Sequence, residues 1–405
     1  MRRIVVTGLG IVSSIGNNRH EVLQSLQNQK SGIEFHQEYA DLGFRSHVCG
    51  TVTAVIKELV PRKHLRFMGD GSAYSYISMA ESIEDAGLTE DDLTSEKTGL
   101  IIGSGVASGL PIVEMADTLR NKGAKKVAPF YVPKIMSSCN AANLATAFKV
   151  RGYSYTLSSA CATSGHCLGN AYQLIQSDEQ DLMFIGGGDE VSWIISIAFD
   201  SMGALSSDFN DKPQSASRAY DRDRDGFVVS GGGGTIVLEE YERAKARGAK
   251  IYCEVTGYGI SSDGNDMVRP SGEGAERCTK MALETVDGPI DYLNAHGTST
   301  PAGDITELVA IKNVFNGNGQ LPHISSTKSL TGHSLGAASV HESIYCILMM
   351  DNDFICPSEN IENLDPEAES YPIVLEPMNN HNLNHVMSNS FGFGGTNCSL
   401  VFSKV

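Results

Sequence analysis

An internal repeat limits the possible fold of this chain more than any other feature of its sequence. Residues 157–171, LSSACATSGHCLGNA, align without a gap with residues 324–338, ISSTKSLTGHSLGAA. The stretch VTGLGI at residues 6–11 likewise resembles VTGYGI at residues 255–260. Self-similarity of this kind indicates that one structural unit has been duplicated. We therefore expect two related halves that pack as one body.

Apolar, β-branched runs alternate with longer helix-like stretches, which is typical of an α/β fold built from βαβ units. The first half is longer between its VTG strand and its small-residue turn, so we expect an insertion within residues 30–150. A basic, Gly-containing stretch near residues 243–248 predicts halves at 1–247 and 248–405. The expected strands are residues 3–7, 98–102, 182–185, 234–238 and 251–255, and the expected helices are 70–86, 162–176, 274–286, 306–315 and 337–350.

Charge and cysteine usage exclude several classes of protein. The chain of 405 residues has a net charge of −17, which is unfavourable for binding nucleic acid or an anionic membrane. No apolar run approaches the roughly 20 residues of a membrane span, and we interpret the N-terminus as a strand rather than a signal peptide. Nine cysteines without a CxxC pair are typical of free thiols in the cytoplasm. No Cys/His cluster has metal-ligand spacing, so we expect no metal.

The best candidate nucleophile is Cys161, which lies where a strand-like stretch passes through small residues into a helix. A thiolate at a helix N-terminus is stabilised by the helix dipole and by free N–H groups, so we expect a lowered pKa. A buried packing role is the alternative for an isolated free cysteine. Cys167, six residues further along the predicted helix, fits that packing role better.

Two histidines and a glycine-rich segment could stabilise negative charge. His296 follows a predicted strand in NAHGTSTPAGD, where a neutral imidazole could donate a hydrogen bond to an oxyanion. His333 shares its Gly-His-x-Leu-Gly context with His166 in the first half, so the pattern alone leaves a packing role open. Residues 392–397, GFGGTN, could present backbone N–H groups to a developing charge, or form a plain hairpin turn between strands 386–389 and 398–402.

Taken together, these motifs resemble the β-ketoacyl-acyl carrier protein synthases, the condensing enzymes of fatty acid synthesis, and are most similar to their bacterial type I branch. The resemblance covers nearly the whole chain, in SSACATS, GGGDE, YDRDRDGFV, NAHGTSTPAGD, TKSLTGHSLGA and SNSFGFGGTN. It implies the thiolase fold, in which duplicated βαβαβαββ halves form a five-layer αβαβα core. It also implies a decarboxylating Claisen condensation of malonyl-acyl carrier protein with an acyl group held on the enzyme.

The resemblance also implies catalytic roles. Cys161 would carry the acyl group, His296 and His333 would stabilise the enolate that forms when malonyl thioester loses CO₂, and the amides of Cys161 and Phe393 would form an oxyanion hole. Lys328 would orient the site. The other residues that the resemblance places are Thr298 and Thr300 at the pantetheine arm, Val106 and Phe391 at the substrate, and Glu342, Asp304 and Glu307 as structural support.

The implied partner is acyl carrier protein, which brings its substrates on phosphopantetheine, and the implied assembly is a homodimer without a further cofactor. Since the carrier is acidic, a local basic patch must outweigh the net charge of this chain. Two clusters are candidates, although plain solvated charge is the alternative. The first contains Arg62, Lys63 and Arg66, and the second contains Arg120, Lys122, Lys125 and Lys126.

Related enzymes fit less well. A thiolase needs a second catalytic cysteine in a C-terminal glycine-rich loop, and a type III starter synthase would replace one histidine by asparagine. A non-catalytic chain-length partner would lack Cys161. A polyketide or aryl-polyene condensing enzyme shares all the motifs and remains the alternative. Val106 and Ala107 follow Gly-Ser-Gly where the type I pattern has more glycines, so chain length and use of unsaturated acyl chains stay open, as does a structural monovalent cation.

Overall fold

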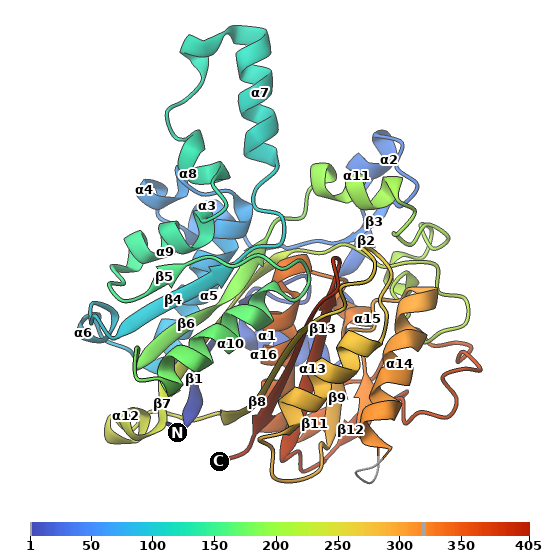
Figure 1. The fold of residues 1–405 in the computed structure, drawn as a ribbon. Coiled ribbons are helices and arrows are strands. Elements are labelled where there is room, and N and C mark those ends of the chain that lie inside the picture. The colour runs from blue at the N-terminus through green and yellow to red at the C-terminus, as the bar shows by residue number, and fades with distance from the viewer. Residues whose placement is uncertain (1, 317–320) are drawn as a thin grey trace.

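A ten-stranded sheet, composed of two five-stranded sheets joined at their edges, forms the centre of the molecule, as the computed structural model of residues 2–316 and 321–405 shows (Figure 1). The two five-stranded sheets meet edge to edge where β1 and β8 pair through Val5–Glu254 and Val6–Cys253. The strands of the first sheet are β1 (Ile4–Val12), β4 (Thr98–Gly103), β5 (Ser154–Tyr155), β6 (Leu182–Asp189) and β7 (Gly232–Glu240). Those of the second are β8 (Cys253–Ser262), β9 (Tyr292–Asn294), β10 (His323–Ser325), β13 (His385–Gly392) and β14 (Thr396–Ser403).

The two sheets have the same topology. Their spatial orders are β5-β4-β6-β7-β1 and β10-β9-β13-β14-β8, which is the order 3-2-4-5-1 when each half is numbered along the chain. In both sheets the three strands farthest from the junction run parallel. The next strand, β7 or β14, is antiparallel to both of its neighbours, so β1 and β8 at the junction again have the direction of the first three. Each half therefore repeats one βαβαβαββ unit, which confirms the predicted duplication and thiolase fold.

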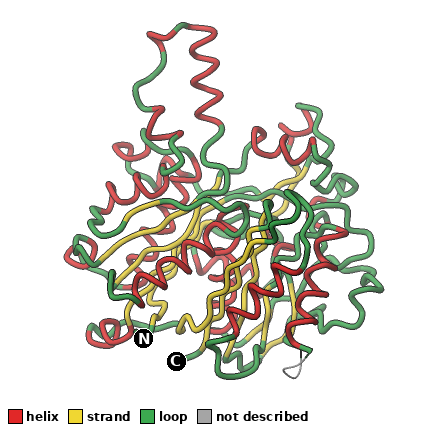
Figure 2. Tube along the Cα trace, in the orientation of Figure 1, coloured by secondary structure: helices red, strands yellow, loops and turns green. Residues whose placement is uncertain are grey.

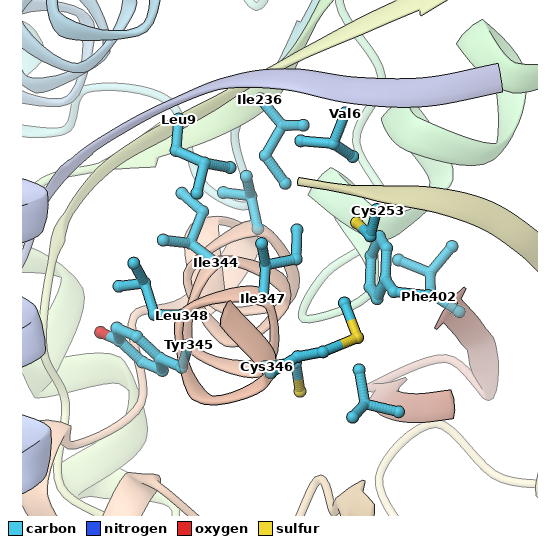
Figure 3. Packing of buried hydrophobic residues seen from close by; sticks show 14 of the residues in the cluster. Val6, Leu9, Ile236, Cys253, Ile344, Tyr345, Cys346, Ile347, Leu348 and Phe402 are labelled. Atoms are coloured by element: carbon cyan, nitrogen blue, oxygen red, sulfur yellow. The ribbon is translucent and has the colours of Figure 1, made fainter. Parts of the chain in front are cut away.

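Helices complete five layers. The outer layers are α5 (Asp70–Ala86) and α9 (Cys139–Phe148) on the first sheet, and α13 (Glu273–Leu283) and α14 (Pro301–Phe315) on the second. The middle layer is α10 (Thr163–Gln176) and α16 (Ala338–Asp351), which contact each other and strands of both halves (Figure 2). Figure 3 shows Ile344 and Ile347 of α16 among side chains from both sheets, such as Leu9 and Phe402.

The repeated Gly-x-Gly of the two VTG motifs has a packing role. A Cβ atom on Gly10 would lie 1.9 Å from the carbonyl oxygen of Ser78 on α5, and one on Gly259 would lie 1.9 Å from that of Cys278 on α13. The outer helix of each half can thus approach its sheet only because these positions lack a side chain. The Gly-x-Gly pattern that the two VTG motifs share is therefore required for the outer helices to pack against the sheets.

The structure corrects the register of the second repeat. The gapless alignment pairs Cys161 with Lys328 and His166 with His333, but α10 and α16 both begin and end 175 residues apart. The Ser159 hydroxyl contacts His166 Nδ1 in the first half, and the Ser334 hydroxyl contacts His341 Nδ1 in the second. His341 is therefore the structural counterpart of His166. His333 lies in a loop that the second half gains together with α15 (Lys328–Thr331).

Insertions distinguish the first half. As predicted within residues 30–150, they add β2 (Ile33–Phe35), β3 (Val48–Gly50) and short helices before α5, and a protrusion after β4 that contains α7 (Leu110–Lys122) and α8 (Tyr131–Ile135) (Figure 1). A further long connection, residues 190–231, joins β6 to β7, where the second half has only the β13–β14 hairpin. Sequence analysis did not predict it. The boundary at 247/248 stays a prediction.

The remaining helices and strands are short and lie around this core. No helix in the described part of the chain is both long and apolar enough to cross a bilayer. These elements are α1 (Arg19–Gln27), α2 (Gln37–Asp41), α3 (Ile56–Leu59), α4 (Arg62–Leu65), α6 (Glu90–Leu93), α11 (Trp193–Ser201), α12 (Tyr241–Ala246), β11 (Phe354–Ile355) and β12 (Met378–Asn379).

Candidate active site

The candidate site lies at the carboxyl ends of parallel strands from both halves. Cys161 follows β5, His296 follows β9, and Lys328 and His333 follow β10. Open α/β sheets bind ligands at this edge. These strands surround a pocket of about 490 Å³, whose lining includes Cys161, both histidines and Phe393. The structure thus brings together the predicted catalytic residues of two separate halves.

Cys161 occupies a strained turn between β5 and α10. The preceding Ala160 has φ of +50°, a left-handed conformation that costs energy for a residue with a side chain, as in nucleophile elbows. Cys161 is the only one of the nine cysteines that is not fully buried. Burial nevertheless raises the pKa of its thiol to about 12, although the charge of Lys328 and the backbone amide of Phe393 act in the opposite direction. The expectation of a lowered pKa in the free protein is therefore wrong.

Both predicted histidines face the cysteine. His333 Nε2 lies 2.9 Å from Cys161 Sγ, and the rings of His296 and His333 are nearly perpendicular, with centroids 5.3 Å apart. Burial and the charge of Lys328 lower the pKa of each imidazole well below its usual value, and His333 adds to this effect on His296. Both rings are therefore neutral near pH 7, and a neutral ring can donate one hydrogen bond and accept another.

The glycine-rich segment is both a hairpin turn and a source of amide groups. Residues 392–396 connect β13 to β14, and the backbone amide of Phe393 hydrogen-bonds to the Cys161 thiol. The Thr396 hydroxyl donates to the carbonyl oxygen of Ser159 at 3.0 Å, which connects the hairpin to the turn that contains Cys161. The two interpretations of GFGGTN are therefore compatible.

Buried charges support the two histidines. Lys328, which is 1% exposed, forms an ion pair with Glu342 of α16. Glu307 of α14 accepts hydrogen bonds from the backbone amides of His296 and Gly297, each at 2.8 Å. Burial raises the pKa of Glu342 and of Glu307 to about 7, although Lys328 lowers the first and the two amides lower the second. Glu307 thus fixes the backbone that carries His296.

Asp304 anchors the loop that contains the two threonines. Its carboxylate pairs with Arg224 at 3.2 Å and accepts hydrogen bonds from the backbone amides of Tyr220 and Thr300. Thr298 and Thr300 have hydroxyl oxygens 3.1 Å apart, and both line the pocket. The loop therefore presents a pair of hydroxyl groups along the path to Cys161.

Two residues placed only by the resemblance also line the pocket. The ring of Phe391 lies 6.0 Å from that of His296, and Val106 is 47% exposed in a loop after β4. Asp189, which is fully buried, holds this loop through the Ser104 hydroxyl and the amide of Gly105. Sequence analysis missed Asp189, although GGGDE contains it.

Three other contacts of the site were not predicted from the sequence. The YDRDRDGFV stretch supplies Arg224, the partner of Asp304, and Phe227, whose ring lies 5.7 Å from that of His333. The carbonyl oxygen of Met267 accepts a hydrogen bond at 2.8 Å from the amide of Gly394, next to Phe393. The sequence alone gave no role to Asp189 or to the YDRDRDGFV stretch. Their partners, such as the Gly105 amide for Asp189 and Asp304 for Arg224, are distant in the sequence, so no local pattern reveals these contacts.

The predicted docking residues lie outside the pocket. Arg62, Lys63 and Arg66 are exposed on and just after α4, and the second cluster is exposed at the outer end of α7 and in the turn after it. Among the described residues, only Arg120 of the seven forms an ion pair, with Asp117 at 3.6 Å. Both groups therefore leave positive charge uncompensated on the surface of an acidic chain.

Family models match most of the chain. The β-ketoacyl synthase N-terminal domain matches residues 1–244, and the C-terminal domain of the same name matches residues 252–362. The two matches divide the chain near the junction of its two sheets.

Individual proteins give the same result. The chain is 58% identical to "3-oxoacyl-[acyl-carrier-protein] synthase 1" of Haemophilus influenzae, and the alignment covers 100% of this chain and 99% of that protein. It is 55% identical to the protein of that name from Escherichia coli K12, with full coverage of both. A type II polyketide ketosynthase in complex with its acyl-carrier protein, AntDE:AntF, superposes with a TM-score of 0.90 at 29% identity, covering 100% of this chain and 99% of that one.

Proposed function

Because this chain belongs to the β-ketoacyl synthase family, we propose that Cys161, His296 and His333 carry out a decarboxylating condensation in its pocket. The enzyme is an acyltransferase of fatty acid elongation, which joins an acyl group to malonyl-acyl carrier protein and yields β-ketoacyl-acyl carrier protein. The observation that carries the assignment of roles is the 2.9 Å contact between His333 Nε2 and Cys161 Sγ, at the end of a pocket that also contains His296.

In the first half-reaction, Cys161 sulfur attacks the acyl thioester. Since burial raises the pKa of the thiol, the proton must leave as the S–C bond forms, and the neutral ring of His333 is placed to accept it. The Phe393 amide next to the sulfur stabilises the oxyanion of the tetrahedral intermediate. The carrier thiol departs, and the proton held by His333 leaves with it.

In the second half-reaction, malonyl thioester loses CO₂. The electron pair of the broken C–C bond moves onto the thioester oxygen as an enolate, and the neutral rings of His296 and His333 donate hydrogen bonds to that oxygen. His333 does so from Nε2, after its single ring proton has exchanged to that nitrogen between the two half-reactions. The enolate carbon then attacks the Cys161 thioester, and the Cys161 thiolate leaves. No strong base is required, because release of CO₂ generates the carbon nucleophile.

The supporting residues act by positioning. Lys328 places a positive charge near the Cys161 thiolate, and its ion pair with Glu342 fixes the ammonium group. Glu307 holds the backbone of His296, and Asp304 holds the loop of Thr298 and Thr300.

Two pairs of residues are assigned to the substrate. The hydroxyl groups of Thr298 and Thr300 would bind the amide groups of the pantetheine arm, and the apolar side chains of Val106 and Phe391 would contact the acyl chain.

Acyl carrier protein is the proposed macromolecular partner. The relatives are named for that carrier, and the AntDE ketosynthase was solved in complex with its own carrier protein. Uncompensated basic side chains on an acidic surface offer a docking patch for an acidic carrier. We assign this patch to Arg62, Lys63, Arg66, Lys122 and Lys125, with Arg120 and Lys126 beside them.

We propose that the enzyme is a homodimer. The α7–α8 protrusion buries only Pro111 of α7 and no residue of α8, while Leu119 is 52% exposed and Val132 is 70% exposed. β5 is an unpaired edge of the sheet. A second copy of this chain would cover both features, because a protrusion of this size without a core of its own needs a partner.

The proposed reaction uses no metal or other cofactor of its own, because phosphopantetheine arrives with the carrier protein. We also propose that the enzyme acts in the cytoplasm. The nine cysteines all lie in the described residues, and none is paired with another, which suits a reducing compartment.

A condensing role in a polyketide or aryl-polyene pathway is the second candidate, because the fold extends to the polyketide ketosynthase AntDE. The identities of 58% and 55% to synthases named for acyl carrier protein, against 29% to AntDE, favour fatty acid elongation. A condensation assay with malonyl-acyl carrier protein and acyl carriers of several lengths, saturated and cis-unsaturated, tests this directly. Turnover of simple acyl chains supports elongation; turnover of polyketide intermediates alone contradicts it.

The Cys161→Gln variant separates the two half-reactions. A neutral amide at this position resembles the acylated cysteine and leaves His296 and His333 in place. We expect release of CO₂ from malonyl-acyl carrier protein to continue while condensation stops. Loss of both activities in a variant that melts like the wild type would show that Cys161 also takes part in decarboxylation.

A further inference from the structure

The catalytic residues also form a set of soft ligands. Cys161 Sγ and one ring nitrogen of each of His296 and His333 all lie within 4.8 Å of one another. This is the only group of three potential metal ligands found among residues 2–316 and 321–405. The three side chains come from separate segments, so their spacing in the sequence could not reveal the group.

We propose that the resting enzyme binds one thiophilic divalent cation, with Zn²⁺ as the physiological case, through Cys161, His296 and His333. One thiolate and two imidazoles form a donor set that suits zinc, with the pocket supplying a water molecule as the fourth ligand. On binding, the S–H bond of Cys161 breaks, a Zn–S bond forms and the proton passes to solvent. No electron is transferred, so no oxidant or reductant is needed.

The distances suit this set after small side-chain movements. Zn–S and Zn–N bonds of about 2.3 and 2.0–2.1 Å in a tetrahedron place S and N atoms roughly 3.3–3.6 Å apart. The Sγ–Nε2 distance between Cys161 and His333 is 2.9 Å, and every distance in the set is at most 4.8 Å. These distances lie on both sides of the range that a tetrahedral zinc site requires.

The charges around the three ligands are mixed. Lys328 faces the cysteine and opposes a cation, but it is paired with Glu342. Glu307 lies behind His296 and bonds to its backbone amide. Together with the thiolate, these two carboxyl groups offset the charge of Lys328 and part of the charge of a bound dication.

The consequence is inhibition. A cation held by Cys161 blocks acylation, whereas an acylated sulfur is no longer a thiolate and cannot bind the cation. Zinc and acyl group should therefore exclude each other. This inhibitory effect rests on the proposed function, but binding of the metal does not.

Binding can be measured without substrate. We would titrate metal-free protein with Co²⁺, which substitutes for Zn²⁺ and shows a thiolate-to-metal charge-transfer band together with the ligand-field bands of a tetrahedral site. We expect one Co²⁺ per chain, displacement by Zn²⁺ and removal by a chelator. Failure to form the charge-transfer band with the wild-type protein would overturn the proposal. A protein that shows the band but does not condense would instead refute the proposed function.

Variants locate the ligands. The Cys161→Ser variant, and wild-type protein alkylated at Cys161, should lose the charge-transfer band, and the His333→Ala variant should bind Co²⁺ at least 10-fold more weakly. The matched control is His381→Ala, since the rings of His381 and His323 form another close pair, 5.1 Å apart. This variant should bind Co²⁺ like the wild type. A band that survives alkylation of Cys161, or is lost in His381→Ala, would place the metal elsewhere and contradict the proposal.

Discussion

At the scale of single residues, accessibility distinguishes Cys161 from the other eight cysteines. It alone is not fully buried, so iodoacetamide should label Cys161 first and abolish condensation. Because burial raises the pKa of the thiol to about 12, the thiolate fraction should rise about tenfold per pH unit through the neutral range. We therefore expect the labelling rate to increase about 100-fold from pH 7 to pH 9, measured by mass spectrometry of the modified peptide. A plateau below pH 8 would contradict a raised pKa.

The two histidines of the shared Gly-His-x-Leu-Gly pattern should respond differently to alanine. His333 contacts the nucleophile, so His333→Ala should slow decarboxylation by ~10²–10³ while Cys161 still accepts an acyl group slowly. His166, which does not line the pocket, bonds instead to the Ser159 hydroxyl and to the Asn397 carbonyl oxygen.

The His166→Ala variant should therefore lose about 1–3 kcal/mol of folding free energy, seen as a lower melting temperature. Its CO₂ release per folded enzyme should stay near the wild-type rate. If His166→Ala stopped decarboxylation and His333→Ala did not, the roles assigned to the two residues would have to be exchanged.

The sequence was sufficient to predict the main residues that the pocket brings together, but less so those that hold them in place. Cys161, His296 and Phe393 lie in motifs with unusual local composition, and the structure brings them together. Asp189 and Arg224 act through backbone amides and carboxylates that are distant in the chain, so no local pattern reveals them. The raised pKa of Cys161 could not be predicted from the sequence either. The local sequence indicates that a helix begins there, but burial of the thiol depends on residues from the whole pocket.

At the scale of elements, the helices and strands predicted from the sequence all correspond to elements of the core, because hydrophobic periodicity determines them. The short elements around the core were not predicted. The helix predicted at 162–176 is α10, Thr163–Gln176, and that predicted at 337–350 is α16, Ala338–Asp351. The alignment of the repeat failed where the second half gains α15 and the loop of His333. Residues of the same type in the two repeat segments therefore occupy different places in the two halves, since a gapless alignment cannot show an inserted turn.

The exposed basic residues on and after α4 allow a test of carrier-protein docking. Charge reversal at Arg62, Lys63 and Arg66 should raise KM for carrier-protein substrates about 10-fold or more, because these exposed side chains have no acidic partner among the described residues. Activity with small acyl-pantetheine thioesters should hardly change, since the cluster lies outside the pocket. Reversal at Arg3, which pairs with Glu254 on the surface, is the matched control. An equal loss with both kinds of substrate would show that the cluster acts through the fold.

At the scale of the whole molecule, the two duplicated units form the core, and the segments that differ between them supply the side chains of the candidate site. The two halves share one topology, and their middle helices contact each other. Figure 3 shows side chains of α16 packed with side chains from both sheets. Cys161 comes from the first half, while both histidines and the Phe393 amide come from the second. Neither half alone contains all of these groups, so the candidate site exists only where the two halves pack together.

The α7–α8 protrusion leads to the prediction for the assembled enzyme. If a second copy covers it, Val132→Asp should place a charge in the interface and shift the protein from dimer to monomer in sedimentation equilibrium. Val309→Asp is the matched control, because Val309 is 46% exposed on α14, away from the protrusion. This variant should sediment like the wild type. A wild-type protein that is monomeric at micromolar concentration, or a Val132→Asp variant that remains dimeric, would show that the protrusion does not form the interface. In either case its exposed apolar surface would need another partner.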